Sequence, residues 1–248
     1  SIAYSLKVYV NGVASATVGE TDTANVVVQL AAMQEIKGSF VLEGSDRKDF
    51  DFSGFYVRLS SASPATFGGM GGRTKSDGTF VLTQAQPGRY RINVGSPASE
   101  GYVKSIQAGG EDVYGKEVDL SALASGFRIV LRLDAGNVKG TVEVPDELKP
   151  EMRSPGVILI PADARLRSNS TTKIVQMDQN NGFEVKGLRP GDYLAFAFGD
   201  YDYSSFEDAE FCAAIESQGT KVSVGPNESK TLSLKVLKWP VEFADRLE

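Results

Sequence analysis

The chain has 248 residues, of which 41% are hydrophobic and 23% charged, as in folded globular proteins. Its formal charge is −6 and Lys and Arg form no run, so no nucleic-acid or anionic-membrane partner is expected. With no histidine and one cysteine, the chain excludes Ser-His-Asp triads, Cys-His pairs, His-bearing zinc sites and internal disulfides. No apolar run approaches about 18 residues, so no transmembrane segment is expected.

Period-two alternation dominates from the start of the chain. In residues 2–10, IAYSLKVYV, every second residue is apolar, which is typical of a half-buried strand. The segment VVVQLAAMQEIKG ends in the same join as the later segment IVLRLDAGNVKG. We therefore expect residues 1–34 to be the trailing half of a β-sandwich module. Its open sheet edges leave pairing with another chain as an alternative.

A repeat of about one hundred residues follows. IKGSFVL at 36–42 matches VKGTVEV at 138–144, and GFYVRL at 54–59 matches GVILIP at 156–161, both with an offset of 102. SDGTFVLTQAQPGRY and NNGFEVKGLRPGDY share Phe, Pro, Gly and Tyr at an offset of 103, since 183 − 80 = 103. We predict one sandwich over 35–134, a second over 135–240 and a tail over 241–248.

The shared phrase reads as strand, turn and strand. Asp77-Gly78 and Asn181-Gly182 are turn pairs, because these residues tolerate a positive φ. Pro-Gly then forms a second turn, and Tyr90 or Tyr193 opens the next strand. Each Tyr is expected to bury its ring and bond backbone through its hydroxyl, as tyrosine corners do.

The pattern D-x-x-G-x-F, followed seven residues on by P-G-x-Y, resembles the carboxypeptidase regulatory-like modules, which belong with the transthyretin-like (prealbumin-like) β-sandwiches. The P-G-x-Y part is intact in both repeats, whereas the glycine of the first part has moved to Gly182 in the second. The resemblance covers nearly the whole chain. It implies an all-β fold of tandem transthyretin-like Greek-key β-sandwiches. It also implies a non-catalytic role beside adjacent modules of an exported, extracytoplasmic bacterial protein.

No motif predicts catalysis, a metal or a cofactor. Gly72-Arg73-Thr74 lacks the first glycine and the lysine of a phosphate loop. DQNNG at 178–182 starts like a calcium loop, but Arg189 stands where the bidentate Glu is needed. Cys212 is expected to be a small buried apolar residue. We expect no enzyme, although a hydrolase using two carboxylates stays open.

The second module carries an extra segment, FGDYDYSSFEDAEFCAAIESQG at 198–219. Ser205 followed by Asp208 resembles a capping box, and Phe211 and Ile215 share a helical face, so a short helix is predicted near 205–217. The preceding strand, YLAFAF, is apolar on both faces and needs cover on both. We expect the helix to cover its outer face.

Besides that hydrolase, two functions remain open from the sequence. The first is a non-enzymatic spacer or interaction segment, with a protein or polysaccharide as partner. The alternative is a carbohydrate-binding module whose aromatic platform and carboxylates come from the loop before the helix: Asp200, Tyr201, Asp202 and Tyr203. Under the first interpretation these rings pack beneath the helix. Trp239, beside Pro240, is expected to pack against a module that follows.

Overall fold

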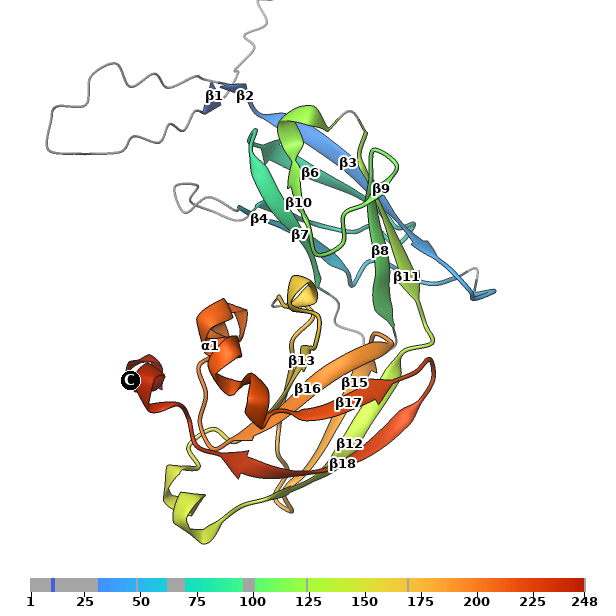
Figure 1. Ribbon diagram of the computed structural model, residues 1–248. Coiled ribbons are helices and arrows are strands. Elements are labelled where there is room, and N and C mark those ends of the chain that lie inside the picture. Colours follow the sequence, from blue (N-terminus) through green and yellow to red (C-terminus); the bar gives the residue numbers. More distant parts are fainter. Residues whose placement is uncertain are drawn as a thin grey trace, which may run out of the picture. The chain divides into compact units, whose positions relative to one another are not determined.

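The computed structural model describes residues 10–11, 31–47, 49–61, 70–95, 101–123, 125–168 and 170–247 (Figure 1). The chain divides into two compact units. Unit 1 comprises residues 1–40, 49–95 and 106–129, and unit 2 comprises residues 41–48, 96–105 and 130–248. Most of the half module predicted over 1–34 lies outside the described residues, so that prediction and the module boundaries stay predictions.

Almost all regular structure in the described residues is β-strand. The strands that precede the second copy of the sequence repeat are β1 Val10–Asn11, β2 Ala31–Ala32, β3 Gln34–Leu42, β4 Tyr56–Ser61, β5 Met70–Arg73, β6 Thr79–Ala85, β7 Arg89–Gly95, β8 Tyr102–Ala108, β9 Glu111–Asp112, β10 Glu117–Asp119 and β11 Phe127–Arg132. The later strands are β12 Gly136–Glu143, β13 Gly156–Pro161, β14 Lys173–Gln176, β15 Gly182–Leu188, β16 Gly191–Phe198, β17 Thr220–Val224 and β18 Ser229–Leu237.

Helical segments are short. The α-helix is α1 Ala209–Ile215, and the 3-10 segments are η1 Leu120–Ala122, η2 Asp146–Glu151, η3 Ala164–Leu166, η4 Tyr203–Glu207, η5 Glu216–Gln218 and η6 Val241–Leu247. None of the helices in the described ranges is long and apolar enough to span a membrane.

Unit 1 is built on two sheets. One has the strand order β10-β7-β4-β5, and the other has the order β6-β3-β11-β8-β9, with the ends of β3, β8 and β11 assigned to unit 2. Strand β4 illustrates the pattern, since Val57 and Leu59 are fully buried whereas Tyr56 and Arg58 are exposed. Because side chains alternate along a strand, each such strand gives one face to the core and one to solvent.

Unit 2 repeats this strand order. Strands β15-β12-β18 correspond to β6-β3-β11, and β17-β16-β13-β14 corresponds to β10-β7-β4-β5. The first and last strands, β12 and β18, run parallel over seven residue pairs from Asn137↔Ser229 to Glu143↔Lys235. The two groups of strands are joined where β16 meets β18.

The repeat seen in the sequence is also a repeat of register. Gly38 faces Phe80 in unit 1, and Gly140 faces Phe183 in unit 2. Both pairings shift register at the same place, between Gln34 and Ile36 and between Gly136 and Val138. The predicted all-β fold of tandem sandwiches, with one short helix in the second, is thereby confirmed.

The tyrosine-corner prediction has a different outcome in each of the two units. Tyr193 faces Val222, and its hydroxyl donates a 2.7 Å hydrogen bond to the Arg189 carbonyl. Tyr90 lies at the equivalent position and is 1% exposed, but its hydroxyl has no hydrogen-bond partner among the described residues. The corner bond is therefore present in unit 2, and the described part of unit 1 lacks it.

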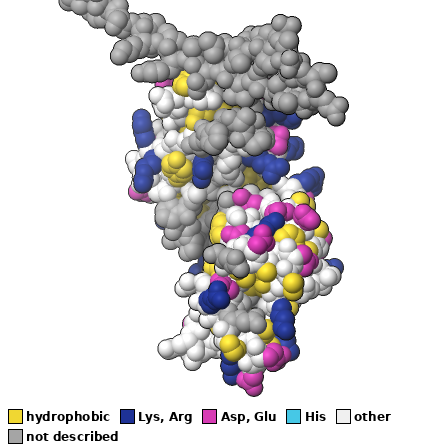
Figure 2. Space-filling view, turned by 90° about the vertical axis from the view of Figure 1, so that its left-hand side faces the viewer, with side chains coloured by type: hydrophobic (Ala, Val, Ile, Leu, Met, Phe, Trp, Pro, Cys, Tyr) yellow, Lys and Arg dark blue, Asp and Glu magenta, His cyan; other side chains and the backbone are white. Residues whose placement is uncertain are grey.

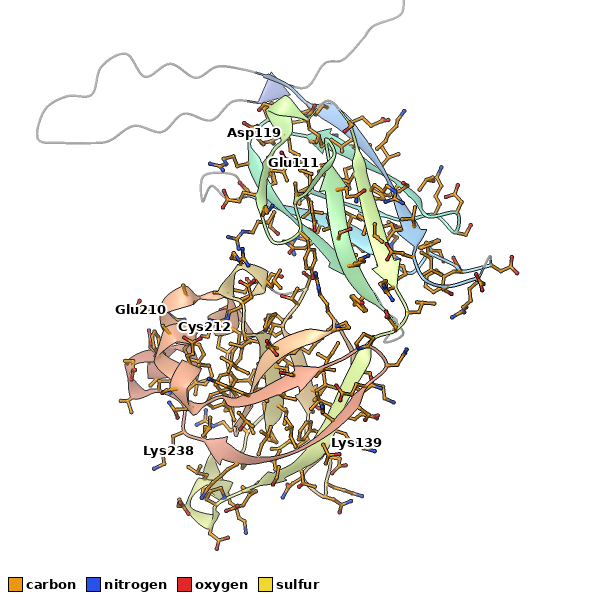
Figure 3. All side chains as sticks on the ribbon, turned by 45° about the vertical axis from the view of Figure 1, so that its right-hand side comes forward. Glu111, Asp119, Lys139, Glu210, Cys212 and Lys238 are labelled. Atoms are coloured by element: carbon orange, nitrogen blue, oxygen red, sulfur yellow. The ribbon has the colours of Figure 1, made fainter. Side chains whose placement is uncertain are left out.

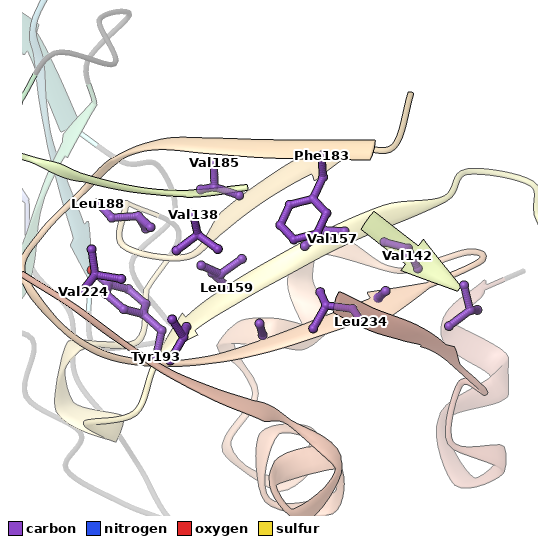
Figure 4. Packing of buried hydrophobic residues seen from close by; sticks show 14 of the residues in the cluster. Val138, Val142, Val157, Leu159, Phe183, Val185, Leu188, Tyr193, Val224 and Leu234 are labelled. Carbon is purple, nitrogen blue, oxygen red and sulfur yellow. The ribbon is translucent and has the colours of Figure 1, made fainter. Parts of the chain in front are cut away.

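The core of unit 2 lies between its two groups of strands (Figure 4). Alternate residues of both groups point inward and meet there, as expected for a sandwich. The labelled members of this core are Val138, Val142, Val157, Leu159, Phe183, Val185, Leu188, Tyr193, Val224 and Leu234.

A second apolar cluster covers the outer face of β13 and β16, as YLAFAF predicted. Phe211, Cys212 and Ile215 of α1 are buried against the outward side chains of those strands, which include Phe196 and Phe198. Figure 3 shows Cys212 on the inner side of α1 and Glu210 on its outer side. The predicted helical lid is confirmed.

The start of the helix differs from the predicted capping box. Ser205 is buried in η4, and Asp208 is the N-cap of α1, accepting hydrogen bonds from the amides of Glu210 and Phe211 at 2.7 and 3.2 Å. The segment contains two successive caps, because Asp202 caps η4 in the same way. The N-cap of α1 is therefore Asp208, three residues after the predicted start at Ser205.

Candidate functional site

The loop that follows β16 carries the four residues predicted for carbohydrate binding. Both carboxylates make hydrogen bonds within the loop. Asp200 accepts from the Tyr201 amide at 3.0 Å. Asp202 accepts from the Ser204 hydroxyl at 2.7 Å and from the Ser205 amide and hydroxyl at 2.8 Å. Asp202 therefore acts as the N-cap of η4 and stabilises the turn at its start.

The electrostatics of Asp202 reflect this role. Burial alone acts to raise the pKa of its carboxyl, but hydrogen bonds from Ser204 and Ser205 outweigh burial and lower the pKa. A carboxylate with donors already in place favours its charged form. Asp202 therefore stays ionised as a cap.

The two tyrosine rings lie in different environments. The Tyr201 ring is partly buried, 6.4 Å from the Phe206 ring between centroids, and it lies so close to Gly156 that a Cβ there would stand 2.6 Å from its Cε1. Tyr203 is 46% exposed, and burial of its hydroxyl region, followed by the nearby Glu207 carboxylate, raises its pKa. The predicted site therefore has one exposed ring rather than an exposed pair, and its role in binding stays a prediction.

A pocket of about 300 Å³ lies next to this loop in unit 2. Asp200 and Arg153 contribute its charged groups, and Trp239 contributes an aromatic one. The remaining lining residues are Leu148, Pro150, Gly199, Val236, Leu237, Ala244 and Leu247. Its volume is at the lower end of the range of about 300–1,000 Å³ found for small-molecule sites. Asp200 is the only carboxylate that lines it, so this pocket supplies no pair of catalytic carboxylates.

Trp239 packs within unit 2 rather than outward. Its ring centroid lies 4.5 Å from that of Phe211, and its indole N–H donates a 2.9 Å hydrogen bond to the Phe243 carbonyl. Residues 241–247, predicted as a tail, form η6. Arg246 anchors this segment through a 2.8 Å ion pair with Asp208 and lies 4.6 Å from the centre of the Phe243 ring.

The other motifs behave as turns, strands or core residues. Gly72 and Arg73 belong to strand β5, not to a loop before a helix. The Asp178 carboxylate accepts hydrogen bonds from the amides of Asn180 and Gly182, both at 2.8 Å, which closes a turn. Cys212 is buried, and burial raises the pKa of its thiol. Within the described ranges, no group of three or more Cys, Asp or Glu side chains is placed to hold a metal ion.

Sequence reasoning missed a charged network around the connection between β11 and β12, which is Leu133–Ala135. The Arg132 guanidinium donates two hydrogen bonds to the Asp134 carboxylate, at 2.9 and 2.6 Å. Arg132 also reaches Glu43 at 3.4 Å, and Lys104 pairs with Glu43 at 2.5 Å. Hydrogen bonding to Arg132 lowers the pKa of Asp134 below its ordinary value. Glu43 is 89 residues from Arg132 and 61 from Lys104 in sequence, so no local motif points to the network.

The backbone of the connection is held as well. The Asp134 carbonyl accepts a 3.0 Å hydrogen bond from the Asn227 amide, and the Asn137 amide donates to the Glu228 carbonyl at 2.8 Å. A Cβ on Gly101 would lie 2.6 Å from the Arg132 carbonyl oxygen, so the chain passes close by at that point. All these residues belong to unit 2.

Comparison with known proteins gives structural similarities alone. No family model matches the chain, and no curated protein matches it. The carboxypeptidase regulatory-like resemblance therefore stays a prediction.

Similar solved structures include bacterial pilins and adhesins with β-sandwich domains. The minor pilin GBS52 of Streptococcus agalactiae is 13% identical with a TM-score of 0.31, over 83% of this chain and 98% of the pilin. A putative adhesin from Bacteroides ovatus is 12% identical with a TM-score of 0.30, over 83% and 93%. The Bacillus anthracis TIE protein is 10% identical with a TM-score of 0.28, and 93% of this chain spans 41% of its length. At these values the similarities carry no conclusion about function.

Proposed function

We infer that this chain is a non-enzymatic structural segment of a larger exported bacterial protein, in which repeated β-sandwiches act as spacers. The observation that supports this proposal is the restraint on the connection between β11 and β12. A spacer needs short, held joints, because a free linker lets adjacent modules swing. Here the chain enters unit 2 within β11, and the three residues that join β11 to β12, Leu133–Ala135, are held there because Asp134 is bonded through both its side chain and its carbonyl.

The Arg132–Asp134 pair is well suited to this restraint. Isolated surface ion pairs contribute about 0–1 kcal/mol. Two parallel N–H···O bonds to one carboxylate also fix its orientation, and here the Asp134 side chain is only 17% exposed. We expect the pair to control local opening of the connection more than global stability.

Trypsin provides a direct test, since Arg132 is itself a cleavage site at the start of the connection. Mass spectrometry measures the native-state rate at which the fragments 1–132 and 133–248 appear. We expect slow cleavage in the natural chain and at least tenfold faster cleavage in Asp134→Ala. The matched control is Asp146→Ala, which removes the exposed 2.6 Å pair with Lys149 and should leave that rate unchanged. Natural-chain cleavage as fast as that of a free peptide spanning 128–138 would contradict the proposal.

The alternative, carbohydrate binding by the loop after β16, keeps a specific observation in its favour. Tyr203 is 46% exposed, and Asp200 of the same loop lines the pocket of about 300 Å³. Tyr203→Ala is the sharper variant, because Tyr201→Ala also removes packing against Phe206. A glycan screen should then show binding that Tyr203→Ala loses while its unfolding midpoint stays the same. Absence of binding by the natural chain at millimolar glycan would contradict this alternative.

A further inference from the structure

The outer face of the sheet β10-β7-β4-β5 in unit 1 gathers arginines that are distant in sequence. Arg73 of β5, Arg58 of β4 and Arg91 of β7 are all exposed. Strand pairing sets Arg58 opposite Gly71 and Asn93, Arg73 opposite Tyr56, and Arg91 opposite Ser60. Arg58 is therefore the diagonal neighbour of both other arginines.

The spacing follows from sheet geometry. Adjacent strands lie about 4.8 Å apart, and diagonal neighbours on one face lie about 7–8 Å apart. Three guanidinium groups thus form one diagonal row across three strands. None of the three forms an ion pair with any described residue, whereas Arg89 on the same face pairs with Glu117 at 3.5 Å. Figure 2 shows several dark-blue Lys and Arg side chains in the upper part of this view, and both dark-blue and magenta side chains in the lower part.

Tyr56 supplies an aromatic surface beside this row. It is 41% exposed, and a Cβ on Gly71 would lie 1.9 Å from its hydroxyl oxygen. The Tyr56 ring therefore lies along the sheet over Gly71, with its other side towards solvent. Gly71 lies opposite Arg58 and Gly95 opposite Tyr56, so neither position adds a side chain to the surface beside the ring.

We propose that this face, formed by Tyr56, Arg58, Arg73 and Arg91, binds an acidic oligosaccharide. Guanidinium groups bind carboxylate and sulfate oxygens through paired hydrogen bonds. The electron-rich face of the Tyr56 ring suits the C–H groups of a sugar ring. Glu117 and Asp119 border the row on β10, so the positive surface ends there and matches a short ligand rather than a long duplex.

The test uses the full chain and fluorescent oligosaccharides of equal length in low salt. Comparing a polyuronate with a sulfated oligosaccharide shows whether a carboxylate or a sulfate is the bound group. Neutral dextran is the control for charge, and oligo-dT is the control for nucleic-acid binding. We expect one or both acidic oligosaccharides to bind, with at least tenfold weaker binding by Arg58→Ala/Arg91→Ala. The control Arg165→Ala removes an exposed arginine of unit 2 that does not line the pocket beside Asp200, and it should bind like the natural chain.

Each other outcome overturns the proposal. No binding of either acidic oligosaccharide would do so, as would equal binding by the double variant with its unfolding midpoint unchanged. Dextran binding as tight as that of the acidic ligands would remove charge as the basis. Tighter binding of oligo-dT would assign the face to nucleic acid instead. Should the double variant unfold, Arg73→Ala, which changes the edge strand β5 alone, tests the same row with an expected loss of at least threefold.

Discussion

Replacing Phe211 by alanine should destabilise unit 2 strongly. The Phe211 ring is 0% exposed and lies between the sheet and η6. Its centroid is 4.5 Å from Trp239, 5.2 Å from Phe243 and 5.5 Å from Phe206. Truncation of a buried Phe typically costs about 3–5 kcal/mol, as the sum of lost transfer free energy and the cavity left behind.

We expect the loss to fall at the upper end of this range. Each aromatic pair contributes about 0.5–1.5 kcal/mol beyond buried area, and three such pairs disappear together. Domains of ordinary size have a total stability of about 5–15 kcal/mol. Phe211→Ala should therefore remove a large share of the stability of unit 2.

Trp239 makes the measurement specific. It is the only tryptophan in the chain and it touches Phe211, so its fluorescence in urea reports on unit 2. The matched control is Glu210→Ala, an exposed neighbour on the same helix, whose effect should stay within about 0.5 kcal/mol. A loss below about 1 kcal/mol for Phe211→Ala would refute the view that α1 is a packed lid.

Three further predictions concern single groups. Tyr193→Phe should lower the free energy of unfolding by about 0.5–1.5 kcal/mol, because it removes the corner hydrogen bond, whereas Tyr90→Phe should be neutral or stabilising; equal losses in urea titrations would contradict this. Hydrogen bonding from Arg246, then from the helix amides, lowers the pKa of Asp208, so its stabilisation is complete above pH about 4 and fades as pH falls through the lower folded-state pKa. Asp208→Asn should flatten the dependence of the unfolding midpoint on pH below about 4, and an unchanged slope would count against the cap. Cys212 should react with a thiol reagent only as fast as unit 2 opens, and rapid labelling of the native chain would show that the thiol is accessible.

Much of the fold could be predicted because its signals are local and repeated. The alternation around Val57 and Leu59 gives the strands, and the shared Phe, Pro, Gly and Tyr give the register. YLAFAF indicated a lid because a strand apolar on both faces needs two covers. The start of the helix was harder to predict from the sequence. Asp202 and Asp208 are both suitable N-cap residues, and only the folded structure shows that Asp202 caps η4 and Asp208 caps α1.

The proposed surfaces could not be predicted from the sequence for a different reason. Arg58, Arg73 and Arg91 are separated by 15 and 18 residues, since 73 − 58 = 15 and 91 − 73 = 18, and form no run. Strand pairing alone brings them onto one face. The Glu43–Arg132 contact likewise depends on chain segments 89 residues apart. The composition gives the net charge of the chain, but it does not show which charged side chains strand pairing places on one face of a sheet.

The most direct test of a restrained connection is a distance distribution across it. Spin labels on Glu111→Cys and Lys139→Cys, in a Cys212→Ser background, place one label in each unit at exposed positions marked in Figure 3. Pulsed dipolar spectroscopy should give one narrow distribution for the natural connection and a broader one for Asp134→Ala. A natural distribution as broad as that of a chain with a flexible Gly-Ser insertion after Leu133 would contradict the spacer proposal.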